Sequence, residues 1–181
     1  MAPHIGPETE TRIGFIDDHP DIVIALGKFI ARWSLAEATL TIAFGIAAKV
    51  EQDISAGVLS STNSAEAKIR LVKTAVKQSD LPEDNKKSMT EALSGLLKLC
   101  ERRNEICHHI WGATNHGDVL TWDFRQPPGL MKRHKFRTTA DINRLSNAAI
   151  KSAYEICKSS GSRWVTEATV AKYHLPDGSR P

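Results

Sequence analysis

Residues 20–50 read PDIVIALGKFIARWSLAEATLTIAFGIAAKV. Apolar side chains recur in this stretch every three or four residues, which is the period of an α-helix with one buried face. Asp17, Asp18 and His19 precede Pro20 and are typical of a helix start. The stretch therefore predicts one long helix from about residue 18 to Val50. The apolar positions that define its face are Leu26, Phe29, Ile30, Trp33, Leu40, Phe44 and Ala47.

Further helical segments follow on the C-terminal side. Asn63-Ser64-Ala65-Glu66 resembles a capping box, which opens a helix. Leu81-Pro82 interrupts the pattern, and Gly112 stands where a C-terminal cap glycine is expected. We therefore expect a short helix that ends near residue 60, and longer helices over about 63–77, 83–111 and 139–159.

Residues 113–138 have a different pattern. Leu120, Trp122 and Phe124 alternate with polar residues, and Pro127-Pro128-Gly129 is typical of a turn. Residues 135–138 are consistent with a returning strand. The predicted fold is an all-α antiparallel bundle of four to five helices, with a small β-hairpin or loop insertion before the last helix. The predicted organisation is a flexible arm over 1–17, a helical domain over 18–164 and a tail over 165–181.

The composition is that of one ordinary globular domain. Hydrophobic residues make up 41% and charged residues 25% of the 181 residues, which excludes disorder of the whole chain. The net charge is only +3, so nucleic-acid binding needs a local basic patch. Three cysteines without metal-ligand spacing favour a reducing compartment. The N-terminus has no signal-peptide pattern, and the apolar run 38–48 is shorter than the ~20 residues of a membrane span. These features predict a cytoplasmic protein without a membrane partner.

Two charged residues fall on apolar helical faces. On a helical wheel, Arg103 lies at the centre of a face formed by Leu96, Leu99, Cys100, Ile106, Cys107 and Ile110. Glu37 lies within the apolar arc of the first helix. A buried charge is costly without a partner, so we expect Glu37 and Arg103 to meet, directly or across an interface. Such a pair either fixes the register of two helices or positions Arg103 for an anion.

A polar cluster surrounds this arginine. Asn104 and His108 are one helical turn apart and lie on one side of the helix, while His109 lies on the other side of the apolar stripe. Histidines in a last helical turn are also favoured by the helix dipole alone. Glu105 and His108 have the ExxH spacing of di-iron bundles, but the sequence has no second ExxH, so no metal is expected. Cys107 is expected to be a small buried hydrophobe rather than a nucleophile.

Arg103-Asn104-x-x-x-His108, near the end of a long helix in an all-α domain, resembles the motif of the HEPN superfamily (higher eukaryotes and prokaryotes nucleotide-binding). Trp111 and the stretch Trp33-Ser-Leu-Ala-Glu37 are also similar to that family, and the resemblance covers residues 20–160. The looser family spacing also admits Arg102 with His108, or either arginine with His109. The doubled histidine and the β-like segment depart from the family pattern.

The resemblance implies a metal-independent endoribonuclease whose site is composed by two copies of the chain. Arg103 is then expected to bind the scissile phosphate, His108 to act as general acid or base, and Asn104 to hold either of them. The RNA 2′-OH is the nucleophile, so DNA is not cut and no cofactor is needed. The resemblance also implies a toxin–antitoxin or phage-defence context, with an antitoxin protein as a partner. The alternative is a non-catalytic dimeric helical module that binds nucleotides or proteins.

A local basic patch is the expected RNA-binding surface. Residues 125–137 contain no Asp or Glu, and Trp122 and Phe124 lie nearby as stacking platforms. A solvated loop is the alternative interpretation. The basic residues of the patch are Arg125, Lys132, Arg133, Lys135 and Arg137.

Overall fold

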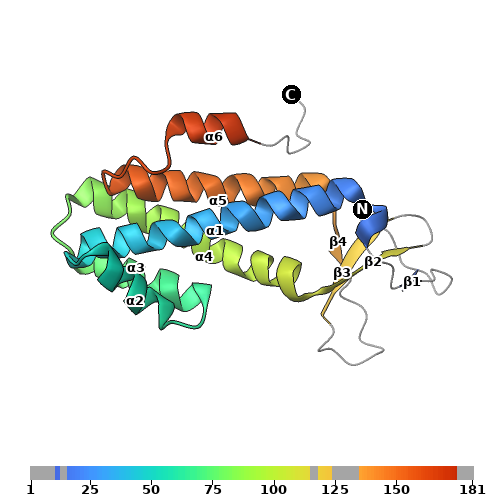
Figure 1. Ribbon diagram of the computed structural model, residues 1–181, viewed down its shortest axis with the longest axis horizontal. Helices are drawn as coiled ribbons and strands as arrows, with labels where there is room; N and C mark the ends of the chain where they lie inside the picture. The colour runs from blue at the N-terminus through green and yellow to red at the C-terminus, as the bar shows by residue number, and fades with distance from the viewer. Residues whose placement is uncertain (1–10, 13–15, 115–117, 124–134, 175–181) are drawn as a thin grey trace.

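The computed structural model describes residues 11–12, 16–114, 118–123 and 135–174, which are drawn in colour in Figure 1. Of Thr11, Arg12, Thr114, Trp122 and residues 135–136, it describes the backbone only. The described chain is mostly helical, with a small antiparallel sheet at one end. This confirms the predicted all-α bundle with a β insertion before the last long helix.

The helices lie close to their predicted positions. Ser64 caps one of them by accepting a hydrogen bond from the Ala67 N–H, as the capping-box pattern indicates. Thr138 and Asp141 form a reciprocal capping box at the start of another. The helices are α1 (Pro20–Ala48), α2 (Gln52–Ser60), α3 (Ala65–Gln78), α4 (Glu83–His108), α5 (Thr139–Ser159) and α6 (Glu167–Tyr173), with a 3-10 turn, η1, at Ile16–Asp18.

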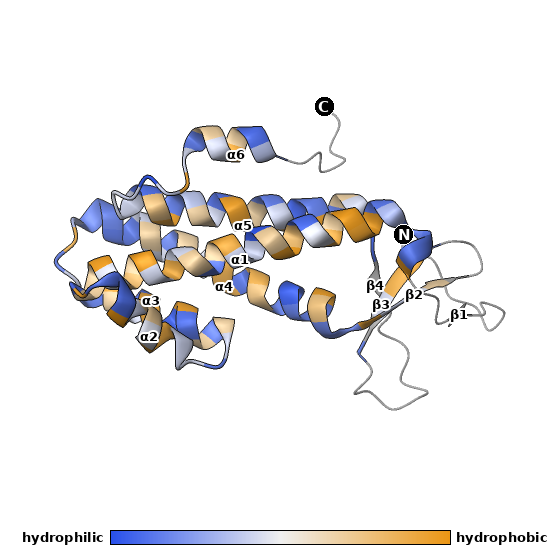
Figure 2. Ribbon diagram, viewed as in Figure 1, coloured by the Kyte–Doolittle hydropathy of each residue, from blue (hydrophilic) through white to orange (hydrophobic). Residues whose placement is uncertain are grey.

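The core lies between α1, α3, α4 and α5, where α5 packs along both α1 and α4. Burying one large apolar side chain contributes about 1.5–3 kcal/mol, so this cluster is the main source of stability. Its fully buried members include Phe29, Leu40, Ile69, Leu93, Leu96, Ile142 and Ile156. Ile30, which the helical pattern placed on the buried face of α1, is 51% exposed instead. Figure 2 shows hydrophobic residues on the outer side of the first turns of α1.

The sheet begins where α4 ends, and this corrects the expected end of that helix. His109 has extended backbone, and Gly112 lies inside a strand rather than at a helix cap. The indole N–H of Trp111 donates to the Ile106 carbonyl at 3.0 Å and satisfies one carbonyl of the last helical turn. The strands are β1 (Thr11–Arg12), β2 (Ile110–Thr114), β3 (Val119–Trp122) and β4 (Lys135–Phe136), which pair antiparallel in the order β1-β2-β3-β4.

Both predicted loose ends contain ordered structure. Residues 11–12 of the expected arm pair with β2, and residues 16–18 form η1. Residues 1–10 and 13–15 lie outside the described residues. The expected tail contains α6, which lies across the outside of the bundle beside α5 (Figure 1). Periodicity does not predict α6, because it is only seven residues long and has no buried residue.

Candidate functional site at the end of helix α4

The last two turns of α4 carry the Arg103-Asn104-x-x-x-His108 motif. A helix turns by about 100° per residue, so Asn104 and His108, four residues apart, lie on one side of α4, and the long side chain of Arg103 reaches both of them. The Nη1 of Arg103 donates to the Oδ1 of Asn104 at 3.2 Å. The same Nη1 lies 3.2 Å from the Nε2 of His108. The fold thus brings together the three residues that the motif selects.

The contact between Arg103 and His108 fixes their chemical roles. A guanidinium can only donate hydrogen bonds, so a hydrogen bond between these two atoms requires the tautomer in which the Nε2 of His108 is the acceptor. His108 is exposed. The site therefore places an imidazole, which can transfer a proton, directly beside a fixed positive charge, which can bind an anion.

Arg103 spans the boundary between core and surface. Its Nε is buried and has no hydrogen-bond partner among the described residues, while its Nη1 reaches the exposed side chains of Asn104 and His108. Arg103 is partly buried, rather than at the centre of a closed apolar face as the helical wheel indicated. The apolar stem remains packed while the charged head reaches water.

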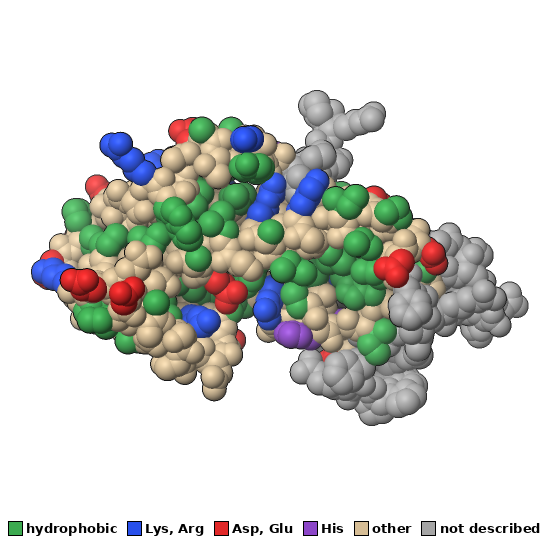
Figure 3. Space-filling model, in the orientation of Figure 1, with side chains coloured by type: hydrophobic (Ala, Val, Ile, Leu, Met, Phe, Trp, Pro, Cys, Tyr) green, Lys and Arg blue, Asp and Glu red, His purple; other side chains and the backbone are tan. Residues whose placement is uncertain are grey.

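Cys107 is exposed, which corrects the prediction of a buried residue. The reason is the position at which α3 begins: α3 packs against α4 but starts only at Ala65, so it does not cover the last turns of α4. The charge of Glu66, in the first turn of α3, still influences the buried thiol of Cys100. Cys107 lies two helical turns further along α4. Figure 3 shows a notch at the lower edge of the molecule, with a histidine and a basic side chain beside it.

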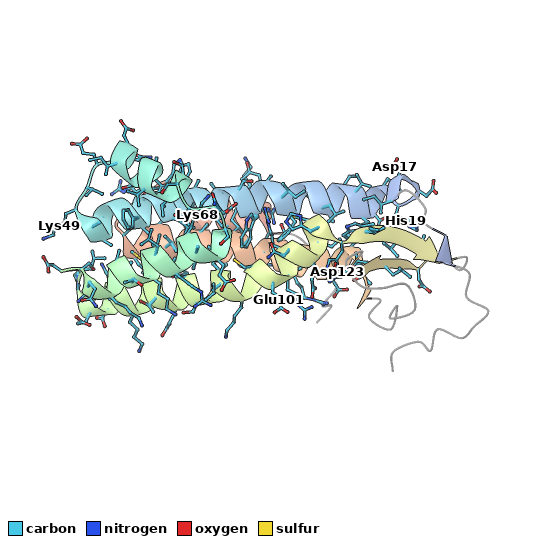
Figure 4. All side chains as sticks on the ribbon, turned by 90° about the horizontal axis from the view of Figure 1, so that it is seen from below. Asp17, His19, Lys49, Lys68, Glu101 and Asp123 are labelled. Atoms are coloured by element: carbon cyan, nitrogen blue, oxygen red, sulfur yellow. The ribbon has the colours of Figure 1, made fainter. Side chains whose placement is uncertain are left out.

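Glu37 lies near the site but does not pair with Arg103. It lines a pocket of about 250 Å³ with residues of α2 and with Lys68, which Figure 4 labels on α3. Within the described chain no ion pair or hydrogen bond joins it to Arg103, so the expected direct contact is wrong within one protomer. Both charges nevertheless act on Cys107: burial raises the pKa of this thiol, Arg103 lowers it and Glu37 raises it.

Glu105 is buried and forms an ionic network that the sequence did not indicate. Its Oε2 lies 3.0 Å from the Nη2 of Arg137 and 3.1 Å from the Nη1 of Arg102. Arg137 also donates from Nε to the Thr121 hydroxyl at 3.0 Å. This network joins the end of α4 to β3 and to the segment between β4 and α5. In Figure 4, which views the bundle from below, α4 continues directly into this sheet.

The network changes the interpretation of two predicted residues. Arg137 is 8% exposed and its guanidinium is occupied, so it does not belong to an exposed basic patch. Glu105 is 8% exposed and forms ion pairs with two arginines. Among the described residues, no group of three or more His, Cys, Asp or Glu side chains is placed to hold a metal ion.

The remaining predicted site residues are placed as follows. His109 is half-buried, and its backbone N–H donates to the Glu105 carbonyl at 3.2 Å. The histidine whose ring nitrogen lies beside the Arg103 guanidinium is His108. Arg125, Lys132, Arg133 and Phe124 lie outside the described residues. For Lys135 and Trp122 only the backbone is described.

Helix α1 is long and apolar enough, by length and composition, to cross a bilayer, and 39% of its most apolar 18-residue window is buried in the bundle. This is weak evidence for a membrane span, because the core helix of a soluble bundle passes the same test. The cytoplasmic location stays a prediction.

Comparisons with protein-family models, with curated proteins and with solved structures find no match for this chain. The function is therefore argued from the geometry at the end of α4.

Proposed function

We propose that this protein is a metal-independent endoribonuclease of HEPN type, which works as a homodimer. The observation that carries the proposal is the 3.2 Å contact between the Nη1 of Arg103 and the Nε2 of His108 at the protein surface. A base and an anion-binding group at this separation match the two needs of RNA cleavage by its own 2′-OH.

The proposed reaction is an internal phosphoryl transfer. His108 removes the proton from the ribose 2′-OH, and the 2′-oxygen forms a new bond to phosphorus. The bond from phosphorus to the 5′-oxygen breaks, and the leaving oxygen takes a proton. The products are a 2′,3′-cyclic phosphate end and a free 5′-OH end. Arg103 binds the non-bridging phosphate oxygens and stabilises their charge, while Asn104 holds the guanidinium in place.

A dimer supplies the second proton-transfer group that this reaction needs. His108 in the neutral form can accept a proton, but a separate donor must protonate the leaving oxygen. The motif lies on an exposed part of α4, where the motif of a second copy could face it. One histidine of the pair then acts as base and the other as acid.

The deciding experiment is a cleavage assay with EDTA present, on structured and single-stranded RNAs. The wild type is compared with His108→Ala, Arg103→Lys and the matched control His109→Ala. We expect His108→Ala to lose roughly 10²–10⁴-fold in rate, which is the usual contribution of a general acid–base group. We expect Arg103→Lys to be strongly impaired, because lysine cannot bind phosphate bidentately.

Three further results separate the proposal from its alternatives. A substrate with 2′-deoxyribose at the cleaved position must stay intact, because it has no nucleophile. If His109→Ala alone loses activity, the reaction class stands but the assignment of His108 is wrong. If folded, dimeric wild-type protein cleaves no RNA in the panel, the enzymatic proposal fails, and the non-catalytic binding module takes its place.

A further inference from the structure

A second candidate site lies between α1, α5 and α6, on the side of α1 that faces these two helices. A pocket of about 580 Å³ opens there, which is within the size range of small-molecule sites. Ala31, Leu35 and Ile150 are among the residues that form its mostly apolar wall. Figure 3 shows hydrophobic side chains gathered between α6 and the helices beneath it, with basic side chains beside them.

Arg32 contributes a buried positive charge to this pocket. The residue is 9% exposed, and burial lowers the pKa of its guanidinium. Its Nη1 donates to the Ser146 hydroxyl at 3.3 Å and to the Asn147 Oδ1 at 3.1 Å, and its Nη2 donates to the Tyr173 carbonyl. All three acceptors are neutral. Within the described chain no carboxylate pairs with Arg32.

This arrangement has the features of an incomplete ion pair. A guanidinium has five N–H donors, and the three hydrogen bonds leave two of them without a described partner. A buried cation without a counter-ion is costly, so an anion that enters the pocket gains a strong partner. Lys28, Lys172 and His174 also line the pocket, and none of its lining residues within the described part of the chain is acidic.

The apolar wall limits which anion fits. The surface that the pocket exposes is mostly apolar, which suits a ligand with an apolar body better than the polar base and ribose of a nucleotide. A carboxylate on an alkyl chain has one charged end for Arg32 and an apolar body for the wall. We propose that this pocket binds a monocarboxylate with an aliphatic chain, such as a free fatty acid, with its carboxylate on Arg32.

The test is isothermal titration of the full chain with sodium decanoate, below the concentration at which it forms micelles. Decanol and adenosine monophosphate are the comparison ligands. The variants are Arg32→Gln, which keeps a polar side chain without the charge, and Ala31→Trp, which fills the pocket from an exposed helical position. Ala171→Trp is the matched control, because Ala171 is exposed on α6 and does not line the pocket.

We expect one decanoate per chain, and a loss of affinity of at least about tenfold in both Arg32→Gln and Ala31→Trp. Ala171→Trp should bind as the wild type does. The proposal is overturned if decanoate does not bind, if Ala31→Trp binds it unchanged, or if decanol binds equally well. Binding of adenosine monophosphate in preference to decanoate also overturns it. If Arg32→Gln does not fold, Ala31→Trp and the decanol comparison still decide.

Discussion

Cys107 offers a direct probe of the proposed site, because it precedes His108 and is exposed. The other two cysteines are buried, and burial raises the pKa of the Cys100 thiol to about 11. Only the thiolate reacts with an alkylating reagent. The three thiols should therefore differ in reactivity according to their exposure.

We predict that iodoacetamide modifies Cys107 first. Although Cys107 is exposed, partial desolvation by the surrounding protein raises the pKa of its thiol above the usual value of 9.0. The thiolate fraction is therefore small at neutral pH, and the rate should rise with pH up to and beyond that value. Modified protein should lose RNA cleavage, because the adduct lies beside the Arg103–His108 pair. Mass spectrometry of the labelled peptides and an activity assay measure both effects.

The control for this prediction is Cys107→Ser. That variant should cleave RNA as the wild type does and should keep its activity after the same treatment. Modification of Cys100 or Cys157 before Cys107 would contradict the described burial of the three thiols. Full activity of protein modified at Cys107 would contradict the position of the site.

At the scale of elements, the Glu105–Arg137 pair holds the end of α4 against the sheet. Both side chains are close to nine-tenths buried, and removing Arg137 deprives the Glu105 carboxylate of its buried partner, while the half-exposed Arg102 remains. We predict that Arg137→Ala lowers the free energy of unfolding by about 3–5 kcal/mol, measured by urea denaturation. Arg102→Ala removes a half-exposed partner of the same Glu105 oxygen and should cost no more than about 1 kcal/mol.

The two arginine variants also distinguish residues that stabilise the end of α4 from residues that take part in RNA cleavage. Neither arginine touches the proposed Arg103–His108 site, so Arg102→Ala should keep the rate of RNA cleavage. Equal losses of stability in the two variants would show that burial of the Arg137 guanidinium has no energetic consequence, and the network would not be what fixes the end of α4.

The same elements show what local sequence determines. The start of α3 was predicted because its capping residue, Ser64, lies next to the helix it caps. The start and end of α5 were predicted closely because an apolar stripe marks its whole length. The end of α4 was predicted too late because Gly112 suggested a cap, whereas it lies in a strand that pairs with β3. That pairing joins residues from two separate strands, and no local sequence pattern indicates it.

The candidate site was only partly predictable for a similar reason. The spacing of Asn104 and His108 predicts that they lie on one side of the helix, and the motif adds Arg103, whose guanidinium contacts both side chains. The helical wheel could not show that α3 begins too late to cover Cys107. It also could not show that Arg137 turns inward to Glu105, because that contact joins residues 32 positions apart.

At the scale of the whole molecule, α1 presents an uncharged outer stripe. Val23, Gly27, Ile30 and Ser34 follow one another at helical spacing and are all exposed. Glu37 continues the stripe at its C-terminal end. Neither Glu37 nor Arg103 has an ion-pair partner among the described residues of its own protomer. A second copy that packs on this stripe would bury its apolar side chains and bring Glu37 of one copy towards Arg103 of the other.

We predict that the wild type is a dimer by light scattering and that Ile30→Asp makes it monomeric, because a charge would be placed at the centre of the interface. Ile54→Asp is the matched control: Ile54 is 54% exposed and lies on α2, away from the stripe, so this variant should stay dimeric. If the site is composed by two copies, Ile30→Asp should lose RNA cleavage while its helical circular dichroism is unchanged. A monomeric wild type that cleaves RNA, or a dimeric Ile30→Asp, would exclude this face as the one that completes the site.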